Sequence, residues 1–158
     1  MEEIIQLNSG AKLSPHFTLG EMTKSSSHPE VYNIPSHEAI ANMKRLCGWL
    51  EVLRERYNEK YGVGEEPIRI NSGYRSPQLN KAIHGVAGSN HMTGCAADIR
   101  VSGMEQAIRY ASILLDYANE SKQEFDELLI ERNHSGVMWL HFAVRPQNNR
   151  KKILYLNT

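Results

Sequence analysis

Two histidines and one aspartate in this chain have the residue types and spacing of a metal site. His91 and Asp98 lie seven residues apart in the segment SNHMTGCAAD (89–98), and His141 lies in the later segment MWLHFAV (138–144). Two imidazole nitrogens and a carboxylate oxygen suit Zn²⁺, with a fourth position left open for water. Zinc would lower the pKa of that water and polarise a carbonyl. Taken singly, the same residues could be a loop histidine, an aspartate in a turn or ion pair, and a strand histidine with a protein partner.

The segment around His141 predicts a strand with two different faces. Side-chain alternation places Trp139 and His141 on one of them. The other face is apolar throughout, with Met138, Leu140, Phe142 and Val144. This apolar face is expected to pack on the core, so His141 is expected to face a cleft.

An arginine occupies a predicted turn at the end of another strand, in the segment INSGYRSPQLN (70–80). Through its fork of donors, Arg75 could bind a carboxylate or a developing oxyanion. The alternative is a turn arginine that packs against the helix following it.

Periodicity and capping signals predict the elements that would position these residues. A long helix is expected over 36–57, with Ser36 as its N-cap, and a second over 104–118. Thr18 and Glu21 have the spacing of a capping box that begins a short helix, and another short helix is expected up to residue 83. Strands are expected over 67–71, 95–101, 125–131, 137–144 and 152–156. Helices alternate with strands early and hairpins come late, which predicts an α+β domain with helices packed on a largely antiparallel sheet.

The 158 residues suit a single domain, 1–158, with a loop-rich segment over 1–35 packing on it. With 18 basic and 18 acidic residues the net charge is zero, which argues against nucleic acid as a partner, and we expect a monomer. No apolar run is long enough to span a membrane, and the start Met1-Glu2-Glu3 lacks the features of a secretory signal, so cytoplasmic synthesis is expected. The two cysteines, Cys47 and Cys95, form no disulfide framework and are expected in the core.

Taken together, the motifs resemble the M15 family of zinc peptidases, the D-alanyl-D-alanine carboxypeptidase family, and most closely its compact bacterial and phage branch. The family pattern S-x-H-x-x-G-x-A-x-D is met in full over 89–98. An S-G-Y-R turn precedes it at 72–75, a W-x-H strand follows at 139–141, and the segment FTLGEM (17–22) resembles the branch's F-T-L-x-E opening. The likeness covers roughly residues 16–145.

The resemblance implies zinc on His91, Asp98 and His141. It also implies that Arg75 contacts the scissile carbonyl or a substrate carboxylate. Ser89 and Trp139 are the candidate substrate contacts beside the metal. The implied fold is the α+β fold shared with the hedgehog signalling domain, and the implied substrate is a bacterial cell-wall (peptidoglycan) peptide.

One position departs from the family. Many members place a general base, a glutamate, three residues before the last histidine ligand, and here that residue is Met138. Glu131, on the preceding strand, is the favoured substitute, because a hairpin could bring it beside the strand of His141. His134, in the hairpin loop, is the second candidate.

Several biological roles fit these motifs. The resemblance allows a D-Ala-D-Ala carboxypeptidase, a dipeptidase or an endolysin that cuts L-alanyl-D-glutamate. A phage or prophage product released to the cell wall by lysis and a cytoplasmic enzyme of peptide recycling both fit. A non-catalytic zinc-binding or phage structural module on the same fold is the rival reading, and the methionine at position 138 favours it.

Overall fold

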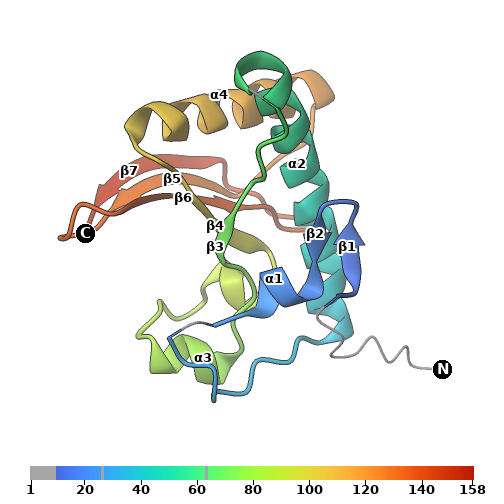
Figure 1. The fold of residues 1–158 in the computed structure, drawn as a ribbon. Coiled ribbons are helices and arrows are strands. Elements are labelled where there is room, and N and C mark those ends of the chain that lie inside the picture. Colours follow the sequence, from blue (N-terminus) through green and yellow to red (C-terminus); the bar gives the residue numbers. More distant parts are fainter. Residues whose placement is uncertain (1–9, 26, 63) are drawn as a thin grey trace.

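The computed structural model describes residues 10–25, 27–62 and 64–158, and its centre is a five-stranded sheet in the order β3-β4-β6-β5-β7 (Figure 1). The start of the chain, on which the expectation about a secretory signal rests, lies outside the described residues. The strands are β3 (Ile70–Ser72), β4 (Ala96–Arg100), β5 (Glu127–Arg132), β6 (Met138–Ala143) and β7 (Lys152–Asn157).

The sheet is mixed, so the prediction of a largely antiparallel sheet is wrong. The β3–β4, β4–β6 and β5–β6 pairs are antiparallel, but β7 pairs with β5 in parallel. The cause is the path of the chain after β6. The chain passes the N-terminal end of β5, and β7 then pairs with the edge of β5 that faces away from β6. The α+β class itself is confirmed.

Two long helices cover one face of this sheet. Helix α2 (His37–Tyr61) begins where predicted, since the side chain of Ser36 accepts a hydrogen bond from the Ala39 amide, and it continues past residue 57. Helix α4 (Met104–Ser121) crosses the same face (Figure 1). Burial of apolar side chains between the helices and the sheet supplies the main stabilisation. The largest fully buried side chains that the sheet contributes are Ile99, Leu128, Leu140 and Phe142.

The described part of the N-terminal segment contains more regular structure than predicted. It forms a short hairpin, β1 (Lys12–Ser14) with β2 (Phe17–Thr18), followed by helix α1 (Leu19–Thr23). The capping box of Thr18 and Glu21 is present as predicted. Strand β1 contacts α2, so this segment packs on the domain.

The connection between β3 and β4 lies on the other side of the sheet, away from α4, and carries helix α3 (Pro77–Ala82) and the 3-10 turn η1 (Asn90–Thr93) (Figure 1). Gly94 ends the turn with a φ of +76°, and a Cβ there would collide with the carbonyl oxygen of Ala39. Only glycine satisfies both conditions, which fixes how the turn leads into β4.

Two further expectations concern the whole chain. Cys47 and Cys95 are free and buried, as predicted. Across the described ranges, neither long helix combines the length and apolar character required to cross a bilayer.

Candidate metal centre

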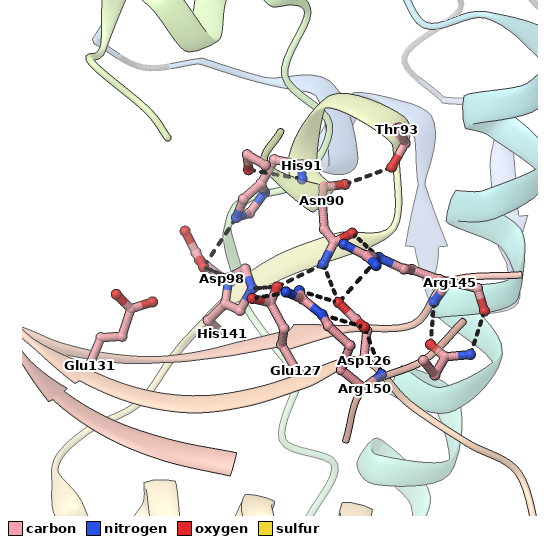
Figure 2. A network of polar contacts seen from close by, with 12 residues as sticks. Asn90, His91, Thr93, Asp98, Asp126, Glu127, Glu131, His141, Arg145 and Arg150 are labelled. Carbon is pink, nitrogen blue, oxygen red and sulfur yellow. Dashed lines mark hydrogen bonds and ion pairs between the residues drawn. The ribbon is translucent and has the colours of Figure 1, made fainter. Parts of the chain in front are cut away.

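Three side chains that are distant in sequence converge on one side of the sheet. His91 comes from η1, Asp98 from the middle of β4, and His141 from the position on β6 directly opposite Asp98. One potential ligand atom from each lies within 4.8 Å of the other two (Figure 2). The structure therefore brings together the three residues that the sequence singled out.

One ring nitrogen of His91 already forms a hydrogen bond within the protein. Its Nδ1 lies 2.7 Å from the carbonyl oxygen of Gly73, and its Nε2 lies 3.4 Å from Oδ1 of Asp98. A carbonyl oxygen can only accept a hydrogen bond, so Nδ1 carries the proton. The lone pair on Nε2 is therefore directed at Asp98 and is free to bind a metal.

His141 is held between two carboxylates. Its Nδ1 lies 2.9 Å from Oδ1 of Asp98, and its Nε2 lies 2.8 Å from Oε1 of Glu127. Burial alone would lower the pKa of His141, but the hydrogen bonds to Asp98 and Glu127 outweigh burial and raise it to about 9. A cation placed between Nδ1 and Asp98 would replace the proton that these two groups otherwise share.

Asp98 is the central anion of the group. Burial would favour its neutral form, but the two histidines hold the pKa of this carboxyl far below its ordinary value. Its second oxygen, Oδ2, accepts a hydrogen bond from Nη2 of Arg75 at 3.3 Å. The ionised carboxylate and the two imidazoles form a donor set that fits zinc, and each ring has an acceptor for its other nitrogen, as ligating histidines almost always do.

The S-G-Y-R turn supports this centre through its backbone as well as through Arg75. Gly73 supplies the carbonyl that orients His91, and the Arg75 amide donates to the His91 carbonyl at 3.0 Å. A Cβ at Gly73 would lie 2.5 Å from the carbonyl oxygen of Met22, so no larger residue fits. The turn thus packs closely against both α1 and η1.

The guanidinium of Arg75 uses all three of its nitrogens. Nε donates to Ser72 Oγ at 3.2 Å, Nη1 to Asn80 Oδ1 at 3.3 Å, and Nη2 to Asp98. These bonds hold the planar group beside the metal ligands and also join it to helix α3 through Asn80. Arg75 therefore places a cationic group directly beside the three candidate ligands.

The proposed base, Glu131, lies on the same face of β5 as Glu127 and is half-buried (Figure 2). Nε1 of Trp139 donates to its Oε2 at 3.1 Å. Burial, together with the negative charge of Asp98, raises the pKa of Glu131. The second candidate, His134, is exposed in the β5–β6 loop, and among the described residues no hydrogen bond links it to the three ligands.

The structure gives Ser89 a supporting position. Its hydroxyl accepts a hydrogen bond from the His91 amide at 3.1 Å and caps η1. The serine of the motif therefore helps to fix the turn that carries the first histidine.

A polar network behind His141 was not predicted from the sequence. Asp126 falls within the strand predicted over 125–131, but in the structure it lies just before β5 begins and is completely buried. Strand alternation does not apply to a residue before the strand. The signal that could have found it is the acidic pair before an apolar strand. The network contains Asn90, Asp126, Glu127, Arg145 and Arg150 (Figure 2).

Comparison with known proteins identifies the family. A sequence profile described as Peptidase M15 matches residues 15–133, well over half of the chain. The chain belongs to the M15 family of peptidases. The family predicted from the motifs is thereby confirmed. His141 lies beyond the matched range, and it is the sheet register that places it opposite Asp98.

The chain is also similar to a protein of known name. Over 97 residues the chain is 29% identical to the zinc D-Ala-D-Ala carboxypeptidase of Streptomyces albus G. The matched region covers 61% of this chain and 36% of that protein, so the chain corresponds to a minor part of its relative.

Proposed function

We propose that this protein is a zinc-dependent peptidase that hydrolyses a peptide bond in bacterial cell-wall peptides, as a carboxypeptidase or an endolysin. The observation that carries the proposal is the convergence of His91, Asp98 and His141, with each histidine already oriented by an acceptor on its other nitrogen. The similarity to a zinc D-Ala-D-Ala carboxypeptidase of Streptomyces albus G supports the substrate class.

Each ligand would use a defined atom. Nε2 of His91, Oδ1 of Asp98 and Nδ1 of His141 face one another and would hold the ion. Zinc bound there supplies a Lewis acid that lowers the pKa of water and polarises a carbonyl. Arg75, beside Asp98, would stabilise the oxyanion of the substrate or bind its carboxylate.

Glu131 would serve as the general base in place of the missing glutamate at position 138. It is the cross-strand partner of Trp139, two residues from His141 on β6, and its carboxylate is fixed by the indole. A raised pKa brings a carboxylate closer to the value that suits proton transfer near neutral pH. Glu131 would take a proton from the attacking water and pass it to the leaving amine.

The substrate would extend along the sheet from the ligands. A cavity of about 420 Å³ adjoins the ends of β4 and β6 and includes Arg100, two residues after Asp98. Trp139 is the cross-strand partner of Arg100, so the two side chains flank the path from the centre to this cavity. We assign Trp139, Arg75 and Ser89 to substrate contact.

The test is hydrolysis of defined muropeptides, followed by mass spectrometry of the products. The zinc-loaded protein is expected to cleave one bond type, the chelated protein to lose this activity, and added zinc to restore it. The masses of the products distinguish removal of a terminal D-alanine from cleavage of an internal bond. Full activity after complete removal of zinc would contradict the proposal.

A non-catalytic zinc-binding module is the second candidate, and the observation that favours it is Met138 at the usual position of the base. The same experiment separates the two functions. A protein that binds zinc in a one-to-one ratio but releases no product from any muropeptide would support the binding function.

A further inference from the structure

The residues behind His141 form a continuous chain of hydrogen bonds that begins at the metal centre. Glu127 Oε1 accepts a hydrogen bond from Nε2 of His141 at 2.8 Å and another from Nδ2 of Asn90 at 2.7 Å. Asn90 Nδ2 makes a second bond, of 2.8 Å, to Oδ2 of Asp126. Its Oδ1 accepts from Nε of Arg145 at 2.9 Å. Asn90 is 6% exposed, and every polar atom of its amide is in use.

These partners determine the orientation of the Asn90 amide. Two carboxylates, which only accept, face its nitrogen, while a guanidinium, which only donates, faces its oxygen. The flipped amide would point its oxygen at both carboxylates and its nitrogen at Arg145. The network therefore admits one orientation, and that orientation directs a donor at Glu127.

The Glu127 carboxylate is held in turn from the side away from the metal. In addition to the bond from Asn90, its Oε2 forms an ion pair with Nη2 of Arg150 at 3.5 Å. The same nitrogen of Arg150 lies 2.7 Å from Oδ2 of Asp126. Glu127 contacts the His141 nitrogen that points away from Asp98, so it cannot reach an ion held at Nδ1. Its geometry suits it to orient the ring rather than to transfer a proton at the centre.

Asn90 also precedes the first metal ligand in η1. The network thus ties the turn that carries His91 to the carboxylate that orients His141, although 50 positions separate the two histidines. We propose that Glu127, held by Asn90, is a positioning residue that keeps the proton of His141 on Nε2 and thereby presents Nδ1 to the metal. This inference rests on the proposed zinc site, and it assigns the ring nitrogen that binds.

The experiment measures zinc affinity by competition with a chromophoric chelator. Loss of a carboxylate that orients a ligating histidine typically weakens binding roughly 10- to 100-fold, and this loss is expected for Glu127→Ala. Glu127→Gln retains an oxygen that can accept from Nε2, so its affinity should lie closer to that of the wild type. If Glu127→Gln binds zinc no more tightly than Glu127→Ala, the inference that a hydrogen-bond acceptor at this position orients the His141 ring is overturned.

Glu124→Gln is the matched control, because it removes a carboxylate at an exposed site just before β5, outside the metal centre. Its zinc affinity is expected to equal that of the wild type. Thermal unfolding of the metal-free proteins shows whether any loss of affinity merely follows a loss of stability.

Nitrogen-15 NMR of the zinc-loaded wild type gives a test that needs no variant. The expected spectrum shows His141 protonated at Nε2 and coordinated through Nδ1. Coordination through Nε2, or a Glu127→Ala affinity within twofold of the wild type, would overturn the inference. Failure of the wild type to bind zinc would instead contradict the proposed function from which it starts.

Discussion

The two ends of strand β5 carry the same residue type on the same face but in opposite electrostatic settings. At Glu127, the hydrogen bond from His141 outweighs burial and lowers the pKa of the carboxyl to about 2. At Glu131, four positions along, burial and the charge of Asp98 raise the pKa. Within the described ranges, Glu127 accepts hydrogen bonds from a histidine and an amide, whereas Glu131 accepts one from an indole alone.

The difference shows how one strand can support two roles. A carboxylate whose pKa is low and whose oxygens are occupied is a poor proton acceptor but a good anchor. A carboxylate whose pKa is raised and which has free capacity is suited to accept and release protons. The contrast arises from the neighbours that the fold places at each end of the strand, and it can be tested at both ends.

The largest effect is expected for Glu131→Gln, which removes the proposed base without changing its size. The rate of muropeptide hydrolysis should fall by roughly 10²- to 10⁴-fold, the usual contribution of a general base. Glu124→Gln, at an exposed site before β5, should leave the rate unchanged. A wild-type rate in Glu131→Gln would remove this residue as the base and with it the contrast along the strand.

Asp126→Asn tests the anchoring end. Asp126 is completely buried and binds Arg150 through the backbone amide, Nε and Nη2. Arg145 also pairs with it, so the substitution removes the anion that the two arginines share. The free energy of unfolding at pH 7 should fall by about 3 kcal/mol, the lower end of the range for broken buried pairs, because both arginines can rehydrate. Chemical denaturation measures the loss, with Glu124→Gln as the control, and a change below about 0.5 kcal/mol would contradict the prediction.

Acid should reduce the difference in free energy of unfolding between the wild type and Asp126→Asn. Burial would raise the pKa of Asp126, but the hydrogen bonds from Arg150 and Asn90 lower it from 3.8 to about 2. A depressed pKa stabilises the folded state above the unfolded value, and this stabilisation is lost as the pH falls through the folded value. The gap between wild type and Asp126→Asn should therefore shrink by about 2 kcal/mol between pH 4 and pH 2. Denaturation at stepped pH measures it, and a gap that stays constant would show that the charge of Asp126 contributes nothing.

The smallest effect is expected for Trp139→Phe, which removes the donor to Glu131. Since this hydrogen bond lowers the pKa of Glu131, its loss should raise that pKa, by under about one unit. The acid limb of the kcat/KM profile for muropeptide hydrolysis should then shift to higher pH. Tyr155→Phe, on the exposed strand β7, should leave the profile in place. A shift to lower pH in Trp139→Phe would contradict this account of the base.

The sequence predicted the parts of this molecule that local pattern controls. Ser36 and Thr18 begin helices where their capping signals lie, and alternation along β6 correctly separates His141 from the apolar face. The ligands were recognised because a spaced motif surrounds two of them and a patterned strand carries the third.

The features that were missed depend on contacts between distant segments. The direction of β7 is set by the path of the chain around the N-terminal end of β5. The sequence of an alternating apolar segment does not indicate which strand it will pair with. Asn90 and Glu127 lie 37 positions apart, and nothing in either local sequence indicates that an amide will face a carboxylate. Side-chain networks of this kind become visible only after the sheet register is known.

The order of the strands also has a consequence for how the protein matures. Strand β6, which carries His141, lies between β4 and β5 although both β4 and β5 precede it in the chain. On the ribosome, His91 and Asp98 therefore emerge well before their third partner, and the sheet cannot close until β6 has inserted at its centre. The complete set of ligands can therefore form only after β6 has paired with β4, so zinc bound by all three residues would mark a molecule in which the centre of the sheet is assembled.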